Sequence, residues 1–154
     1  MISWATPCAA CLSMPGPAPR GLFRPLNLSH KLAGPVFTIE GRRDDTLDAH
    51  QSLLKWCELL SKAPAHVVLI CQPNDHTLAH MGELSSETLA YKNVLGYIVD
   101  GGCRDSAFIE KLGFPVFCGY YTPLDIVGKW AATAFEHPIY NRRCHHSFWR
   151  LGVS

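Results

Sequence analysis

The sequence contains 154 residues, which is enough for one domain with a well-formed hydrophobic core. Apolar residues make up 47% and charged residues 18%, as in ordinary folded proteins, and the net charge of +1 gives no field that would attract nucleic acid or an anionic membrane. No apolar run approaches the roughly 20 residues that span a bilayer, and the N-terminal stretch lacks the pattern of a secretory signal. We therefore expect a cytoplasmic protein that binds neither nucleic acid nor membrane.

The N-terminal stretch, residues 1–30, is rich in proline and lacks periodicity, which predicts an irregular arm. Within it, Cys8 and Cys11 have the C-x-x-C spacing of redox pairs. No strand precedes them and no helix follows, so we expect no chemistry at these thiols. The seven cysteines of the chain are scattered and odd in number, which is typical of buried free thiols in a reduced compartment.

The domain, predicted over residues 31–139, opens with a strand and a helix. Residues 31–39 are typical of a strand, and residues 41–45 of a polar turn. Residues 47–62 carry apolar side chains at helical spacing, and Thr46 can cap the helix that they predict.

An apolar strand at residues 66–71 leads into a loop, residues 72–81, that carries His76 and His80. Their spacing of four would suit two metal ligands on one helix face. The glutamate of a zinc-protease motif is missing between them, so we expect solvent-facing histidines instead.

Residues 82–105 are the stretch around which the rest of the chain is organised. From here the sequence predicts a glycine-led loop followed by a helix (83–92), a buried strand (96–99), a second helix (105–112) and another strand (115–118). A glycine-rich loop at residues 100–102 closes the first of these two strands.

Together with the strand at residues 66–71, these elements alternate strand, helix, strand, helix, strand. The pattern predicts an α/β fold with parallel strands and right-handed crossovers. Parallel strands end at one edge of the sheet, where ligands of open α/β sheets bind. We therefore expect residues 82–85 and residues 101–105 to lie side by side around one cleft.

Three features of this predicted cleft point to chemistry. The amides of residues 82–85 open a helix and can bind a carboxylate or phosphate. Arg104 offers a planar fork to an oxyanion, and Asp105 offers an oxygen ligand to Mg²⁺, which uses one or two carboxylates and keeps several waters. Asp100 or Glu83 could complete the set through water. The alternative is that Asp100 begins a simple turn, while Arg104 and Asp105 are a helix cap with a surface partner.

The C-terminal part of the chain is less regular. Residues 120–123 predict a turn, and residues 125–135 a short helix or an irregular excursion. A zinc site could be drawn from the two ends of the chain, but adjacent residues seldom reach one metal, so we do not expect it. Its ligands would be Cys8, Cys11, Cys144, His145 and His146.

Taken together, these segments resemble the RraA-like family, which includes the divalent-metal-dependent 4-hydroxy-4-methyl-2-oxoglutarate (HMG/CHA) aldolases. The resemblance rests on Gly82-Glu83-Leu84, on residues 99–105 (VDGGCRD) and on residues 113–117 (GFPVF). Its most specific feature is an acidic residue followed, after twenty positions, by an Arg-Asp pair. The similarity extends over residues 31–139.

The resemblance implies a swivelling β/β/α sandwich, usually a homotrimer with sites between subunits. It implies that Arg104 and Glu83 act in catalysis and that Asp105 binds Mg²⁺ or Mn²⁺. The implied substrate-binding set is Gly82, Glu83, Leu84, Ser85 and Arg104. The implied reaction is a retro-aldol cleavage of a 2-oxo acid to pyruvate, with oxaloacetate decarboxylation as a related activity. Both reactions form a pyruvate enolate that the cation and Arg104 would stabilise, so no Schiff-base lysine is required.

Residues 140–154 match nothing in the family pattern, so we expect a divergent tail and a truncated C-terminus. The acidic residue that aldolases contribute from the C-terminal region of a neighbouring subunit has no counterpart here. Two alternatives to a lyase stay open: a non-catalytic regulator that binds a ribonuclease, and an inactive truncated member of the family.

Overall fold

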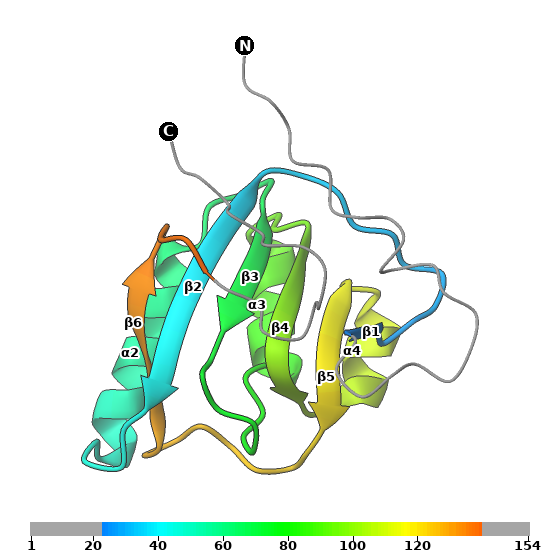
Figure 1. Ribbon diagram of the computed structural model, residues 1–154. Helices are drawn as coiled ribbons and strands as arrows, with labels where there is room; N and C mark the ends of the chain where they lie inside the picture. The colour runs from blue at the N-terminus through cyan, green and yellow to red at the C-terminus, as the bar shows by residue number, and fades with distance from the viewer. Residues whose placement is uncertain (1–22, 140–154) are drawn as a thin grey trace.

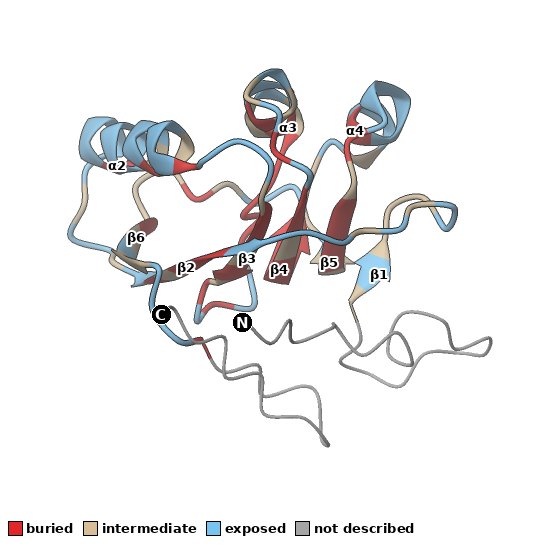
Figure 2. Ribbon diagram, turned by 90° about the horizontal axis from the view of Figure 1, so that it is seen from above, coloured by how far each residue is buried: buried red, intermediate tan, exposed pale blue. Residues whose placement is uncertain are grey.

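The computed structural model describes residues 23–139. The elements follow one another in this order (Figure 1): β1 (Arg24–Pro25), β2 (Val36–Arg43), α2 (Ala49–Lys62), β3 (Val68–Gln72), α3 (Glu83–Tyr91), β4 (Gly96–Cys103), α4 (Ser106–Leu112), β5 (Val116–Tyr121) and β6 (Trp130–Phe135). The strands form a six-stranded sheet in the order β1-β5-β4-β3-β2-β6. Figure 2 shows α2, α3 and α4 together on one face of this sheet.

The parallel centre of the sheet confirms the alternating strand–helix pattern of the sequence. Strands β2, β3, β4 and β5 pair in parallel, and Phe37, Leu69, Tyr97 and Val116 form one row in register across them. All four side chains are buried in the core that the sheet shares with the helices. Because a helix connects each strand to the next, the carboxyl ends of these strands meet at one edge.

Two antiparallel strands complete the sheet at its edges, and the sequence predicted neither. Strand β1 pairs Arg24 with Cys118 of β5, so the expected irregular arm of residues 1–30 contains a short strand near its end. Strand β6 pairs with β2, so the prediction of a helix or an irregular excursion over residues 125–135 is wrong for its second half. The short apolar run of β6 suits a helix or a strand by its pattern alone, and the free edge of β2 decides for the strand.

Trp130 of β6 anchors the corner of the molecule where β6, α2 and the loop before α3 meet. Its side chain is 1% exposed, and its Nε1 donates to the carbonyl of Pro73 at 2.8 Å. Its ring meets Trp56 and His80 edge-on, with centroids 5.8 and 5.1 Å apart. A Cβ at Gly41 would overlap the same ring, so only glycine fits there. The Trp130 side chain thus holds together β2, β6, α2 and the loop that leads to α3.

Helix α2 begins two residues later than the sequence predicts, at Ala49. Its cap is Asp48, whose carboxylate accepts a hydrogen bond from the Gln51 amide at 2.7 Å. Thr46 instead donates through its amide and hydroxyl to Asp44, which closes the preceding turn. A carboxylate at the cap also interacts favourably with the positive end of the helix dipole, which favours Asp48 over Thr46.

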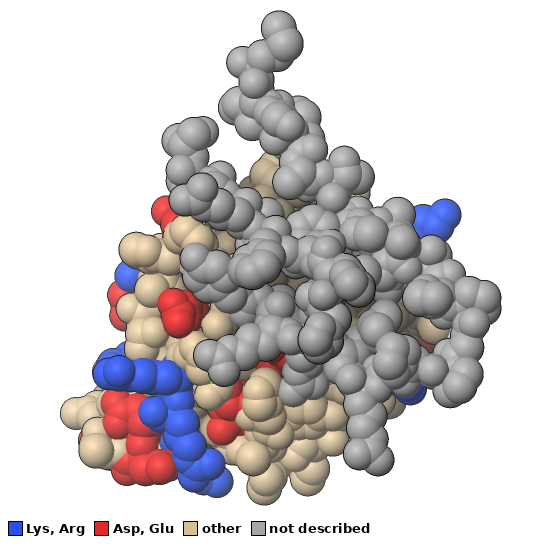
Figure 3. Space-filling view, viewed as in Figure 1, with Lys and Arg blue, Asp and Glu red and all other residues tan. Residues whose placement is uncertain are grey.

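Charged side chains of both signs lie next to one another on the described part of the face in Figure 3, most clearly where β2 ends. There Arg43 pairs with Asp45 at 2.9 Å. Opposite charges this close largely cancel beyond a Debye length of about 8 Å. This part of the surface therefore has no uniformly positive field of the kind that attracts nucleic acid.

The cysteines that the structure describes are free thiols. Cys71, Cys103 and Cys118 are buried, as expected, whereas Cys57 is exposed. The five candidate zinc ligands, which include the C-x-x-C pair, all lie outside residues 23–139. Within that range, no helix combines the length and apolar character needed to cross a membrane.

The two histidines of the loop before α3 have different surroundings. His76 is exposed, as expected, but His80 is fully buried, so the expectation that both face solvent is wrong for His80. Neither ring nitrogen of His80 has a hydrogen-bond partner among the described residues. Burial lowers the pKa of His80 to about 4, with a smaller opposing effect from Asp75 and a further lowering by His76. The imidazole is therefore neutral at pH 7.

We expect the folded state to lose stability as the pH falls from about 6.5 toward about 4, because unfolded His80 takes up a proton in this range and folded His80 does not. The loss between pH 7.5 and pH 5 is about 2 kcal/mol, which urea unfolding at the two pH values measures. His80→Phe keeps a ring against Trp130 and removes the titration of His80, so its loss of stability should be smaller than that of the wild type. Equal losses in His80→Phe and the wild type would contradict this explanation.

Candidate functional site

Two chain segments, residues 79–83 and residues 102–105, lie side by side at the carboxyl edge of the parallel strands, as the topology predicts. Two backbone hydrogen bonds of 2.9 Å join them, from the amide of His80 to the carbonyl of Gly102 and from the amide of Arg104 to the carbonyl of Met81. The start of α3 and the turn between β4 and α4 therefore form one rigid junction.

Strand β4 reaches this junction because it is longer than the sequence predicts. It continues to Cys103, so Asp100 lies inside the strand, largely buried, and not in a closing turn. A Cβ at Gly102 would fall 2.6 Å from the carbonyl oxygen of Leu78. Glycine at this position lets the loop before α3 pack directly on the strand. Both the glycine-rich loop expected at residues 100–102 and the alternative of a simple turn at Asp100 are therefore wrong.

Gly82 lies where the side chains of Arg104 and Asp105 pack against the start of α3. A Cβ there would fall 2.9 Å from Nε of Arg104 and 3.0 Å from Oδ2 of Asp105. The next amide, that of Glu83, donates a hydrogen bond of 3.2 Å to Oδ2 of Asp105. The Asp105 carboxylate thus lies at the N-terminus of α3, where the helix dipole favours negative charge.

The backbone of Asp105 is left-handed, with φ 54° and ψ 33°. A non-glycine residue in this region is uncommon, although aspartate and asparagine tolerate it better than most. Asp105 occupies the cap position of α4 but makes no side-chain cap hydrogen bond there. Asp105 is therefore a helix cap by position only, because its carboxylate turns to α3. The surface partner that this alternative expected is present, since Arg104 pairs with Asp125. Strained backbone of this kind often accompanies functional sites.

Arg104 lies between two carboxylates. Its Nε is 3.7 Å from Oδ2 of Asp105, and its Nη2 is 3.1 Å from Oδ2 of Asp125. The three side chains are between a third and two-fifths exposed, so the group is open to solvent. Sequence reasoning missed Asp125, although its position shortly after strand β5, at the same edge of the sheet, was a usable signal.

The amides that follow Glu83 are the ones placed to bind an anion. The first helical hydrogen bond of α3 runs from the Ser86 amide to the Gly82 carbonyl at 3.0 Å, so the amides of Leu84 and Ser85 precede the hydrogen-bond ladder of the helix. The Ser85 hydroxyl accepts a hydrogen bond from Nε1 of Trp56 at 2.9 Å, which fixes this turn against α2. The Leu84 side chain is 76% exposed and takes no part in the junction.

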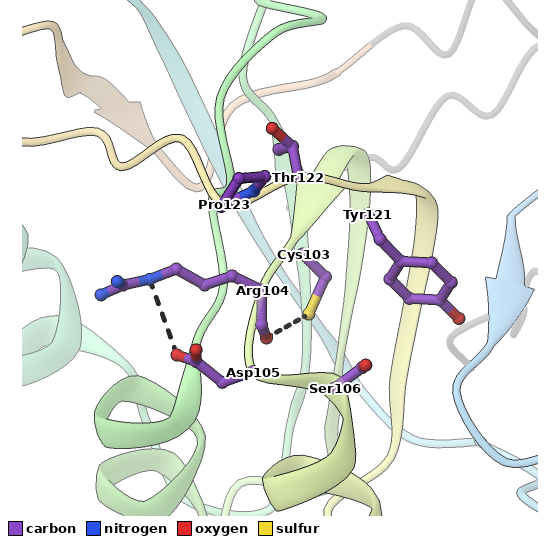
Figure 4. Close-up of a pocket in the computed structure, with 7 residues that line it drawn as sticks. All are labelled: Cys103, Arg104, Asp105, Ser106, Tyr121, Thr122 and Pro123. Carbon is purple, nitrogen blue, oxygen red and sulfur yellow. Dashed lines mark hydrogen bonds and ion pairs between the residues drawn. The ribbon is translucent and has the colours of Figure 1, made fainter.

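A pocket of about 400 Å³ opens beside Arg104 and Asp105, with walls from residues 103–106 and 121–123. Figure 4 shows the Arg104 guanidinium and the Asp105 carboxylate on one side of the turn, and Ser106 and Tyr121 on the other. The residues at the start of α3 do not line this pocket. The pocket therefore covers only part of the site that the hydrogen bonds define.

Cys103 also lines the pocket, and its Sγ donates to the carbonyl of Arg104 at 3.3 Å. A hydrogen bond with the Cys118 thiol, together with burial, raises the pKa of Cys103. The group is therefore a neutral thiol at pH 7, and a thiolate is the nucleophilic form of cysteine. We assign it no nucleophilic role.

A metal at this site would depend on few protein ligands. Among the side chains of residues 23–139, no group of three or more His, Cys, Asp or Glu residues could hold a metal ion. Mg²⁺ commonly binds through one or two carboxylates and keeps several waters, so the partly exposed Asp105 suits it, with Glu83 next to it in the first turn of α3. Zinc, which prefers a closed set of nitrogen and sulfur ligands, fits poorly.

Comparison with known proteins identifies the family. Residues 16–141 match the RraA-like family, described as Aldolase/RraA. The chain belongs to this family. Among its sequence relatives, the "Putative 4-hydroxy-4-methyl-2-oxoglutarate aldolase" of Halalkalibacterium halodurans is 30% identical over 96 residues, which cover 62% of this chain and 43% of that protein. This RraA-like chain thus spans less than half the length of that relative.

Solved structures agree on the RraA-like α/β fold. RraAS2 of Streptomyces coelicolor, an unusual member of the RNase ES inhibitor RraA family, aligns with a TM-score of 0.63 and 22% identity, over 77% of this chain and 58% of that chain. A structure described among novel cellulases from gut-associated microbes aligns with a TM-score of 0.70 and 22% identity, over 77% and 53%. These proteins carry different functional names, so the shared fold does not decide the activity.

Proposed function

We propose that this RraA-like chain is a divalent-metal-dependent lyase that cleaves 2-oxo acids of the 4-hydroxy-4-methyl-2-oxoglutarate type to pyruvate by a retro-aldol reaction. Oxaloacetate decarboxylation is a related activity within the proposal. The observation that carries it is the meeting of the Glu83 amide and the Arg104 guanidinium at one carboxylate, that of Asp105. The N-terminus of a helix, a positively charged guanidinium and a carboxylate suited to a divalent cation then lie together in one place.

The protein groups take the following roles in this proposal. The amides of Leu84 and Ser85 bind the carboxylate of the 2-oxo acid at the start of α3. Arg104 donates to the 2-oxo oxygen and stabilises the negative charge that develops on it when the C3–C4 bond breaks. Glu83 accepts the proton of the 4-hydroxyl, directly or through a water, so that C4 becomes the carbonyl carbon of one product. The electrons of the C3–C4 bond pass into the enolate of pyruvate, which then takes a proton at C3 from water.

Asp105 would hold the divalent cation, Mg²⁺ or Mn²⁺, with water completing the shell. When bound, such a cation supplies positive charge at the developing enolate and orients the substrate oxygens. The chain itself fixes the position of Asp105 through the Glu83 amide and through the left-handed backbone of the residue. In this proposal Glu83, whose amide donates to Asp105, shares the water shell of the cation.

The homotrimer that the family resemblance implies is part of the proposal. The outer face of α3 supports it, because Leu84 and Tyr91 are 76% and 90% exposed. Large apolar side chains exposed in one patch commonly lie in protein interfaces. Light scattering of the whole chain should then give three times the mass of one chain, and a monomer would contradict this part.

The proposal predicts pyruvate release from 4-hydroxy-4-methyl-2-oxoglutarate by the whole chain when Mg²⁺ is present. A lactate dehydrogenase-coupled assay measures it, with oxaloacetate as a second substrate. Excess EDTA should abolish the release, and added Mg²⁺ or Mn²⁺ should restore it. Release that EDTA does not change would exclude a metal-dependent lyase. No release by a folded chain would favour the alternative of a non-catalytic regulator.

A further inference from the structure

A third segment, residues 122–125, completes the junction, although it follows strand β5 and is remote from α3 in the sequence. The Thr122 amide donates to the carbonyl of Cys103 at 3.1 Å, and the Ala79 amide donates to the carbonyl of Leu124 at 2.8 Å. Ala79 also forms parallel bridges with both Gly102 and Asp125. The backbone of Asp125 is thereby fixed relative to the start of α3 and the end of β4.

The Asp125 side chain is held at both of its oxygens. Oδ1 accepts a hydrogen bond from the Val127 amide at 3.3 Å, and Oδ2 lies 3.1 Å from Nη2 of Arg104. The next residue, Ile126, is 5% exposed and anchors the segment in the core. The Asp125 carboxylate thus contacts Arg104 from a segment whose backbone is held in place.

Arg104 meets Asp105 through Nε and Asp125 through Nη2, so two carboxylates contact different nitrogens of one planar group. Contacts at two nitrogens restrict both the position and the rotation of a guanidinium, which a contact at one nitrogen does not. If Asp105 binds a divalent cation, the negative charge of Asp105 no longer balances Arg104, and the cation repels the guanidinium. Asp125 is then the carboxylate that keeps Arg104 in place.

We propose that Asp125 is a positioning residue that holds the Arg104 guanidinium in the orientation needed to bind the 2-oxo acid while Asp105 is occupied by the cation. This inference rests on the proposed function. It predicts that Asp125 affects the affinity for the acid but not the affinity for the cation. A surface ion pair with a purely structural role would affect neither affinity, because such pairs contribute little.

Isothermal titration of the whole chain with oxalate, a planar analogue of the pyruvate enolate, tests the inference. We expect Asp125→Asn to weaken oxalate binding in the presence of Mg²⁺ by about tenfold, the scale of one lost charge-assisted contact. Mg²⁺ binding without oxalate should change by less than about twofold. Asparagine retains an oxygen for the Val127 amide, so the turn should persist. Asp45→Asn, which removes the carboxylate of the Arg43 pair, is the matched control and should change neither affinity.

A double substitution shows whether Asp125 acts through Arg104. In an Arg104→Ala background, titrated at higher oxalate concentrations, Asp125→Asn should cause no further loss. A further tenfold loss there, or unchanged affinity in Asp125→Asn alone, would overturn the positioning role and leave the proposed function standing. Absence of Mg²⁺-dependent oxalate binding in the wild type would overturn both. If Asp125→Asn fails to fold, Asp125→Glu serves in its place, with an expected loss of oxalate affinity at unchanged Mg²⁺ affinity.

Discussion

Replacing Asp105 with asparagine should lower Mg²⁺-dependent pyruvate release by about 10³-fold, because the neutral amide binds the cation that stabilises the enolate much more weakly than a carboxylate does. Asparagine is chosen because it tolerates the left-handed backbone of Asp105, whereas alanine would add strain at φ 54°. Its side-chain oxygen can still accept the hydrogen bond of the Glu83 amide. The unfolding temperature should therefore stay within about 2 °C of the wild type.

The control for this substitution is Asp45→Asn, which removes an exposed carboxylate that also pairs with an arginine. It should retain full activity at every Mg²⁺ concentration. If Asp105→Asn releases pyruvate at the wild-type rate, Asp105 is not the metal ligand. If its unfolding temperature falls steeply, the loss of activity reflects the fold and not the site.

Trp130→Ala should destabilise the folded state by about 3–5 kcal/mol, the usual cost of truncating a buried aromatic residue. The substitution removes the contacts with Trp56 and His80 and leaves the Pro73 carbonyl without its indole donor. Gly41, whose Cα packs directly against the indole, would border the resulting cavity.

For a chain of this length the loss corresponds to a fall in unfolding temperature of roughly 10 °C, which scanning calorimetry measures. Leu28→Ala is the control, because Leu28 is 91% exposed and its removal should cost little. A Trp130→Ala variant as stable as Leu28→Ala would show that the corner around Trp130 is not the rigid unit that the structure indicates.

The parallel centre of the fold could be predicted because its signals are local. Apolar runs alternate with helical patterns from residue 36 to residue 121, and crossover rules then place the strand ends at one edge. Strand β6 could not be predicted, because its apolar run becomes a strand only through pairing with the edge of β2. The burial of His80 was equally hidden, since it depends on Trp130, which is fifty residues away in the sequence.

The same distinction applies to the candidate site. The approach of Glu83 to Asp105 follows from strand topology, so the sequence was sufficient to place them together. The place of Asp125 after β5 put it at the same edge of the sheet, but its pairing with Arg104 could not be predicted. That pairing depends on Ala79, which bridges Asp125 to Gly102 through backbone contacts that have no local sequence signal. The left-handed backbone of Asp105 was also unpredictable, since aspartate at a helix start normally has an extended backbone and caps its own helix.

Oxalate titration of the wild-type chain, with Mg²⁺ and then with excess EDTA, tests the central claim most directly. The proposed site predicts saturable binding with Mg²⁺, no binding with EDTA, and loss of the Mg²⁺-dependent binding in Asp105→Asn. Oxalate binding that is the same with and without Mg²⁺, or that survives unchanged in Asp105→Asn, would contradict it.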